Sequence, residues 1–165
     1  ELLKNLLQFA KPVKPKLVLN NINDTIGEIG ALLESHCAGK HIEIEMNLYP
    51  DMPSILCDHD QIKQVIINIA LKAVDAMQDS DVKMLRFVTS YNQNSVSAVI
   101  KDTGSGMTID QTRKIFDPFY TTKDSGTGLG LSVCHSIIAN HQGRIEVNSK
   151  LDEGTAFTIV IPRFS

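Results

Sequence analysis

Several kinds of residue and segment are scarce in this chain of 165 residues, and each shortage excludes a class of protein. No apolar run approaches the roughly 18 residues that cross a bilayer, and no signal-peptide pattern opens the sequence, so we expect no membrane contact. Basic residues are not in excess: the formal net charge is −3, which argues against a nucleic-acid partner. The three cysteines show no Cys-x-x-Cys spacing, which favours reduced structural thiols and a cytoplasmic location.

The residues that are present suffice for one folded core, since 42% of the 165 are apolar. Residues 1–10 carry leucines at helical spacing, and the following "KPVKP" stretch ends that helix. The sequence begins and ends abruptly, and we therefore expect it to be a piece of a longer protein.

Apolar periodicity predicts helices that alternate with strands. The clearest helix covers 60–77, where apolar residues recur at i, i+3, i+4 and i+7. Further helices are expected from near Asn20, within 106–116 behind a Thr108–Gln111 capping box, and from the 126–130 segment to Gly143 as the C′ residue. Alternating apolar and polar residues predict strands at 41–48, 84–91, 95–102, 144–150 and 154–162. Short polar turns make hairpins of the last four strands, so we expect a mixed or antiparallel sheet with helices on one face. This is a two-layer α/β sandwich of the α+β class.

The glycines of "SGTGLGLSV" (125–133) lie directly before an apolar helix, although glycine is a poor helix former. A glycine-rich loop at a helix N-terminus presents backbone N–H groups and the positive end of the helix dipole to an anion. The segment is neither a Walker A sequence nor a GxGxxG motif after a strand. Taken alone, it is equally compatible with a flexible surface loop.

Three other motifs place polar residues and glycines near this loop. In "KDTGSGM" (101–107), a buried carboxylate could accept a hydrogen bond from an exocyclic amine, although Asp-x-Gly is also common in β-turns. "FDPFYTTK" (116–123) and "EGTAF" (153–157) add aromatic residues, a lysine and another glycine turn. The helix 60–77 carries a polar stripe that is either solvated or lines a site: Gln64, Asn68, Lys72 and Asp75.

In this order, the motifs resemble the catalytic, ATP-binding domain of bacterial sensor histidine kinases, in the superfamily of gyrase, Hsp90 and MutL. The helix 60–77 resembles the N box, "DTGSGM" the first glycine box, "FDPFYTTK" the F box, "GTGLGLSV" the second glycine box and "EGTAF" the last. The resemblance begins at about residue 17 and runs to the end of the chain. It implies the Bergerat-type ATP-binding fold, with ATP and Mg²⁺ as ligands.

The resemblance implies a role for each matching residue. Asp102 is expected to accept a hydrogen bond from the adenine amine, and Thr155 to lie near the same edge of the base. Gly104 and Gly106 leave room for the flat ring. Asn68 is expected to face the phosphates, and it is the candidate metal ligand.

The resemblance also implies a lid over the nucleotide. The hinge of this lid and the phosphate-facing start of the helix are expected at Gly126, Thr127, Gly128, Leu129 and Gly130. Lys123 is a candidate phosphate contact. The aromatic residues Phe116, Phe119 and Tyr120 are expected to pack the lid.

The implied activity is transfer of the ATP γ-phosphoryl group to a histidine on a separate dimerisation domain, with a response regulator downstream and a homodimeric parent protein. Residues 1–14 then form the end of the dimerisation helix and a linker, and 15–165 the catalytic domain. None of the five histidines lies in a sequence that resembles the phosphoacceptor box. His59 is either a metal ligand with Cys57 and Asp58 or part of the turn entering the helix, and the weak spacing favours the turn. His135 and His141 are expected to be surface or packing residues.

The sequence departs from the family pattern at Lys72, where the resemblance places a magnesium-binding Asn. An ammonium group has no lone pair for a metal. Lys72 either contacts the phosphates directly, or impairs magnesium binding and transfer while the fold is retained, or pairs with Asp75 away from the ligand. We favour impaired magnesium binding.

Two other functions remain open. An ATP hydrolase of the same superfamily would carry a glutamate as general base four residues before the magnesium ligand, where this sequence has Asn68. A nucleotide-sensing or pseudokinase module would bind ATP, or only a partner domain, without phosphoryl transfer.

Overall fold

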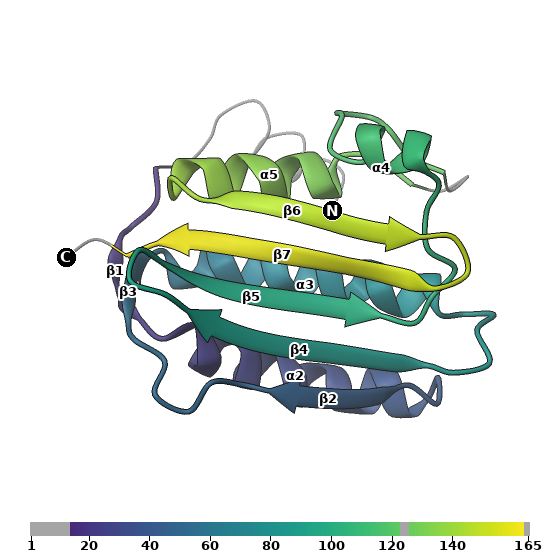
Figure 1. The fold of residues 1–165 in the computed structure, drawn as a ribbon, viewed down its shortest axis with the longest axis horizontal. Coiled ribbons are helices and arrows are strands. Elements are labelled where there is room, and N and C mark those ends of the chain that lie inside the picture. Colours follow the sequence, from purple (N-terminus) through teal and green to yellow (C-terminus); the bar gives the residue numbers. More distant parts are fainter. Residues whose placement is uncertain (1–13, 123–125, 164–165) are drawn as a thin grey trace.

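The computed structural model describes residues 14–122 and 126–163, so the predicted helix at 1–10 and the candidate Lys123 lie outside the described residues. Helices and strands alternate along the chain as the sequence predicts (Figure 1). They are β1 (Val18–Asn20), α2 (Ile22–Ala38), β2 (Glu43–Asn47), β3 (Ile55–Cys57), α3 (His59–Ala76), β4 (Met84–Tyr91), β5 (Ser95–Asp102), α4 (Ile109–Lys114), α5 (Gly130–Asn140), β6 (Arg144–Lys150) and β7 (Gly154–Pro162).

The main sheet has five strands in the order β2-β4-β5-β7-β6. β2 and β4 are parallel, and every other neighbouring pair is antiparallel. Figure 1 shows α2, α3 and α5 behind this sheet, with its other face toward the viewer. The mixed, mostly antiparallel sheet and the two-layer α+β architecture are therefore confirmed.

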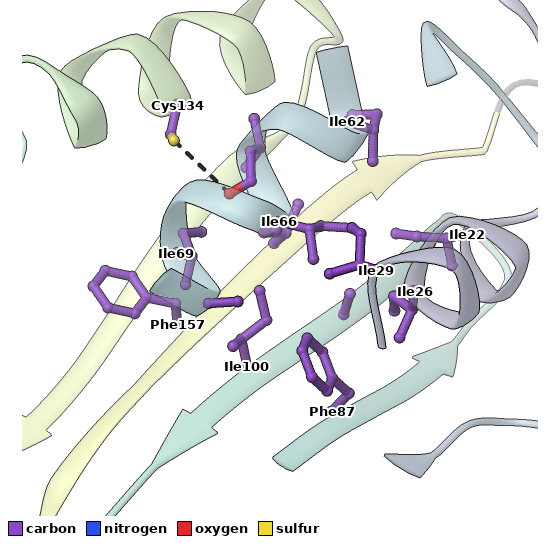
Figure 2. Packing of buried hydrophobic residues seen from close by; sticks show 14 of the residues in the cluster. Ile22, Ile26, Ile29, Ile62, Ile66, Ile69, Phe87, Ile100, Cys134 and Phe157 are labelled. Carbon is purple, nitrogen blue, oxygen red and sulfur yellow. Dashed lines mark hydrogen bonds between the residues drawn. The ribbon is translucent and has the colours of Figure 1, made fainter. Parts of the chain in front are cut away.

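Alternation of side chains places one face of the sheet against the helices. Phe87 of β4 and Ile100 of β5 point into the core, where they are at most 1% exposed. Figure 2 shows these two residues beside Ile66 and Ile69 of α3 and the isoleucines of α2. Burying an aliphatic or aromatic side chain of this size contributes about 1.5–3 kcal/mol. The apolar stripe predicted for 60–77 is thus the central element of the core.

Side-chain caps fix the first turns of α2, α3 and α4. The Asp58 carboxylate accepts a hydrogen bond from the Gln61 backbone N–H at 3.1 Å at the start of α3. Burial alone would raise the pKa of Asp58, but hydrogen bonds from the backbone N–H groups of Lys16 and Gln61 prevail and lower it. At the start of α4 both hydrogen bonds of the predicted Thr108–Gln111 capping box are present.

Two features differ from the sequence prediction. The antiparallel pair β1–β3 was not predicted, because strands of three residues carry no measurable alternation. The prediction of Gly143 as the C′ residue of the last helix is wrong: α5 ends at Asn140, and Gln142 is the residue with positive φ, at 58°. Gly143 has no room for a side chain, since a Cβ there would lie 2.4 Å from the Val160 carbonyl oxygen.

No helix within residues 14–122 and 126–163 has both the length and the apolar character needed to cross a membrane.

Candidate functional site

A cavity of about 840 Å³ opens beside the second half of α3. Its walls come from five further segments: the loop between α3 and β4, the loop after β5, the region of α4 and the residues that follow it, the start of α5, and the β6–β7 turn with the beginning of β7. Lining residues include Lys72, Ala73, Asp75, Ala76, Asp102, Gly104, Gly106, Met107, Ile115, Tyr120, Gly128, Leu131, Thr155 and Phe157. All five motifs of the sequence contribute lining residues to this one cavity, although they lie far apart along the chain.

Asp102, the last residue of β5, is a carboxylate that is only 2% exposed. Its Oδ1 accepts hydrogen bonds from the backbone N–H groups of Gly104 at 2.8 Å and Thr155 at 3.3 Å. Within the described residues Oδ2 takes part in no hydrogen bond, and the residue lines the cavity. Burial raises the pKa of Asp102, although the two N–H donors oppose this shift. The geometry thus fixes one oxygen and leaves the other to accept a hydrogen bond from a ligand.

Thr155 lies beside Asp102, and its side chain contacts a residue of the neighbouring strand β6. Its Oγ1 is 2.8 Å from Oγ of Ser149 on β6, and the residue is 5% exposed. The loop after β5 approaches the same turn closely, because the Asp152 backbone N–H donates to the Ser105 carbonyl at 2.8 Å. Gly106 is required in this loop: its φ is 64°, and a Cβ would lie 1.9 Å from the Lys150 carbonyl oxygen.

The second glycine box closes another side of the cavity against the F box. Gly128 has a φ of 67°, and its carbonyl accepts a hydrogen bond from the Phe119 backbone N–H at 3.0 Å. A Cβ on Gly128 would lie 2.2 Å from the Phe119 carbonyl carbon, so only glycine permits this approach. Leu129 is fully buried and anchors the segment, while Gly126 and Thr127 are exposed.

The aromatic residues of the F box have different surroundings. Phe116 packs on Phe157 and His135, with ring centroids 6.4 Å and 5.6 Å apart. Tyr120 lines the cavity, whereas the Phe119 side chain is 63% exposed.

Lys72 lines the cavity and lies against the start of α5. Its Cε is 3.6 Å from the position that a Cβ on Gly130 would take. The N-cap of α5 is Leu129, whose side chain makes no capping hydrogen bond. An ammonium-bearing side chain and the positive end of a helix dipole therefore meet at one corner of the cavity.

Asn68 lies one turn before Lys72 and does not line the cavity. Its Nδ2 donates to the Cys134 thiol at 3.7 Å, and the thiol lies 3.9 Å from the Val65 carbonyl oxygen, a contact drawn in Figure 2. Burial raises the pKa of Cys134 to about 12, against opposing effects of the Asn68 amide and the Lys72 charge. Cys134 is thus a packing residue between α3 and α5.

The predicted site residues separate into two groups. The cavity lining contains Lys72, Asp102, Gly104, Gly106, Gly128 and Thr155. Within the described residues it does not contain Asn68, Gly126, Thr127, Leu129 or Gly130. Sequence reasoning missed the apolar lining from Met107, Ile115 and Leu131, although Met107 and Leu131 lie within motifs that it used and Ile115 directly precedes one.

Two histidines are structural. His59 is the first residue of α3, and its Nε2 lies 3.4 Å from a carboxylate oxygen of Glu28. Among the described residues, no group of three or more His, Cys, Asp or Glu side chains is suited to hold a metal ion. His141, expected at the surface or in packing, is 3% exposed. Its Nδ1 donates to the Ile137 carbonyl at 2.8 Å.

Residues 57–165 match the family described as histidine kinase-, DNA gyrase B-, and HSP90-like ATPase. The chain belongs to this family. As an ATPase-type domain of this family, it uses ATP, and the resemblance of the motifs to histidine kinase catalytic domains is confirmed.

The histidine kinase-like chain is similar to two kinases of Bacillus subtilis (strain 168). It is 40% identical to sporulation kinase A over 166 residues, which covers 98% of this chain and 27% of that kinase. It is 38% identical to sporulation kinase E over 160 residues, which covers 94% of this chain and 21% of that kinase. The chain therefore spans only a fifth to a quarter of these relatives.

Solved histidine kinase structures share the fold. The nucleotide-free catalytic domain of histidine kinase ThkA matches with a TM-score of 0.81 and 29% identity, over 90% of this chain and 96% of that one. Full-length ShkA in complex with AMPPNP matches with a TM-score of 0.88 and 25% identity, over 99% of this chain and 36% of that one. ThkA in complex with the response regulator protein TrrA matches with a TM-score of 0.84 and 26% identity, over 99% of this chain and 46% of that one.

Proposed function

We propose that the cavity binds ATP with its adenine at Asp102 and its phosphates near Lys72 and the start of α5. The observation that carries this proposal is the Asp102 carboxylate, which is buried and held through Oδ1 while Oδ2 is left for a ligand donor. An exocyclic amine offers such a donor. The uncapped start of α5 and the Lys72 side chain supply positive charge for phosphates.

The proposed activity is that of a sensor histidine kinase catalytic domain. The domain would hold ATP so that the imidazole of a separate dimerisation domain reaches the γ-phosphorus, with the phosphoryl group passing to nitrogen and ADP leaving. The similarity to the two sporulation kinases supports this proposal. We further propose a cytoplasmic location, a homodimeric parent and a response regulator as downstream partner; ThkA has been crystallised with such a regulator.

Magnesium is the ion that the family implies, and the residues of this chain do not fit it well. Mg²⁺ requires oxygen ligands, whereas Lys72 brings an ammonium to the expected position. The amide of Asn68 contacts the Cys134 thiol, and this residue is absent from the cavity lining formed by the described residues. We therefore assign no step of the reaction to a metal ion held by these residues.

This misfit favours a second candidate function, a nucleotide-binding module with little or no phosphoryl transfer. The ATP hydrolase function is the weakest of the three. Its general base would stand at Asn68, and an amide cannot take up the proton of an attacking water.

The test is phosphoryl transfer from labelled ATP to the dimerisation domain of the parent kinase, supplied as a separate protein. Acid-labile phosphate on that domain would support the kinase function. Nucleotide binding without transfer would select the second candidate, and steady release of phosphate without an acceptor would select hydrolysis. The chain alone should not become phosphorylated, because none of its histidines is the acceptor; label on its own residues would contradict the assignment.

A further inference from the structure

A hydroxyl group of strand β6 holds the two residues that lie against Asp102. Ser149 donates from its Oγ to the Gly154 carbonyl oxygen at 3.1 Å, and this Oγ lies 2.8 Å from Thr155 Oγ1. Thr155 in turn donates its backbone N–H to Asp102, and a Cβ on Gly154 would overlap the Asp102 carbonyl oxygen. Ser149 itself is not among the described residues that line the cavity, so it reaches the site only through these neighbours.

The two contacts of Ser149 determine where the hydroxyl protons lie. A serine hydroxyl has one proton to donate, and a carbonyl oxygen can only accept. Since Ser149 gives its proton to the Gly154 carbonyl, the 2.8 Å contact requires the Thr155 hydroxyl to donate to Ser149 Oγ. Thr155 lines the cavity, and its Oγ1 therefore has only lone pairs left for a ligand there.

The side chains at this wall of the cavity consequently present acceptors and no donor. Oδ1 of Asp102 already accepts two backbone N–H groups, and within the described residues Oδ2 takes part in no hydrogen bond. Thr155 Oγ1 adds a second acceptor beside this carboxylate. A base with an exocyclic amine supplies the donor that such a wall requires. A base with a carbonyl oxygen at the same position places acceptor against acceptor, which leaves both groups unsatisfied.

We propose that Ser149 is a positioning residue that sets the base specificity of the cavity, because it turns the Thr155 hydroxyl proton away from the ligand. This inference rests on the proposed ATP site with adenine at Asp102, and it defines the preferred bases as purines with an amine at position 6. Without the Ser149 hydroxyl, Thr155 Oγ1 can rotate and donate its proton into the cavity. That donor would then satisfy a carbonyl oxygen at position 6, and such purines would be rejected less strongly.

ADP and inosine diphosphate test this proposal, because inosine diphosphate carries a carbonyl where ADP carries the amine. Calorimetry measures both affinities in one buffer. The unaltered chain should bind ADP about tenfold or more tightly, since the carbonyl leaves Asp102 Oδ2 without a donor. In the Ser149→Ala protein this preference should fall about threefold or more, chiefly through tighter binding of inosine diphosphate. Equal weakening of both nucleotides would show that Ser149 only supports packing, and would overturn the proposal.

Two further variants test whether Ser149 acts through Thr155. Ser149→Thr keeps a hydroxyl group and should keep the preference of the unaltered chain for ADP. Thr155→Val removes the hydroxyl that Ser149 orients, so adding Ser149→Ala to this variant should change the preference no further. If Ser149→Ala lowers the preference by the same factor with and without the Thr155 hydroxyl, Ser149 acts by another route and the proposal is wrong.

Ser136→Ala is the matched control. The Ser136 hydroxyl donates to the Ser132 carbonyl at 3.1 Å within α5, and Ser136 is not one of the described cavity-lining residues. This variant should keep both affinities of the unaltered chain. If the unaltered chain binds neither nucleotide, or binds both equally, the adenine assignment is wrong and this inference falls with it. A preference for ADP that persists unchanged in Ser149→Ala overturns only the role of Ser149.

Discussion

His141 Nε2 accepts a hydrogen bond from the Asp58 backbone N–H at 3.0 Å, although the two residues are 83 positions apart. The other ring nitrogen donates to the Ile137 carbonyl at 2.8 Å, and these two partners define a neutral ring with its proton on Nδ1. One imidazole thus ties the end of α5 to the cap of α3. These are the two helices that meet at Lys72 and Gly130.

We expect His141→Ala to destabilise the domain by about 2–4 kcal/mol, because the Asp58 N–H loses its acceptor and the side chain leaves a cavity. Urea unfolding followed by circular dichroism measures this change. His36→Ala is the control: His36 is exposed near the end of α2, and its loss should change stability by less than about 0.5 kcal/mol. Equal urea midpoints for the His141→Ala protein and the unaltered chain would show that the link carries no stability.

Asp102→Asn should weaken adenine-nucleotide binding by about 1.5–3 kcal/mol, or roughly 10- to 100-fold. The amide can keep the hydrogen bonds from Gly104 and Thr155 through its oxygen, but it then presents an N–H donor to the donor of the ligand. Calorimetric titration with ADP measures the effect. Asp152→Asn is the matched control, since Asp152 lines the cavity, is exposed, and has a φ of 62° that asparagine tolerates. Unchanged affinity in the Asp102→Asn protein would refute the adenine assignment.

The same carboxylate predicts a pH dependence. Burial raises the pKa of Asp102, so the folded state holds this proton at a higher pH than the unfolded chain does. The resulting stabilisation is fully present below the unfolded pKa and is lost as the pH rises through the folded pKa. Nucleotide affinity should change in the opposite direction, falling as acid protonates the acceptor. A pH profile of ADP affinity checks this, and Asp102→Asn should flatten it.

Much of the fold follows from the sequence because its strands are long enough to show alternation. The bounds of β4, β5, β6 and β7 agree with the predicted strands, and α3 begins and ends one residue from the predicted helix. The β1–β3 pair and the parallel register of β2 on β4 depend on partners far along the chain, which no local pattern specifies. In the candidate site, too, some features follow from local sequence and others depend on residues far along the chain. Asp102 could be assigned from its motif, whereas the contacts of Lys72 with α5 and of Asn68 with Cys134 arise from helix packing.

Gly128→Ala should loosen the contact between the second glycine box and the F box. The new Cβ would clash with the Phe119 backbone, and alanine disfavours a φ of 67° by roughly 1–2 kcal/mol. We expect nucleotide affinity to fall severalfold together with a modest loss of stability. Gly27→Ala is the contrasting control, because nothing lies within 4 Å of its Cβ position in the middle of α2. The Gly27→Ala protein should be more stable than the unaltered chain by about 0.5–1 kcal/mol. A Gly128→Ala protein that keeps both the stability and the nucleotide affinity of the unaltered chain would contradict the proposed packing.

The buried thiol of Cys134 predicts a loss of stability in alkali. Burial raises its pKa to about 12 from an ordinary value of 9.0, so the unfolded chain ionises first. The stabilisation from this group is fully present below about pH 9 and declines as the pH rises toward 12. Urea midpoints at pH 8 and pH 10 should therefore differ more in the unaltered chain than in Cys134→Ala. An identical pH dependence in both proteins would show that the thiol ionises freely in the folded state.

The position of β7 in the sheet has a consequence for synthesis of the chain on the ribosome. β7 is the last strand in chain order, yet it pairs with β5 on one side and β6 on the other. While β7 is still inside the exit tunnel, the β4–β5 hairpin can form, but β6 has no strand to pair with among the described elements. A nascent chain at this stage exposes the unpaired edge of β5 and the unfinished apolar layer beneath it, and such exposed edges are prone to aggregation. Completion of this domain therefore depends on the nine-residue strand β7 leaving the exit tunnel and inserting between β5 and β6.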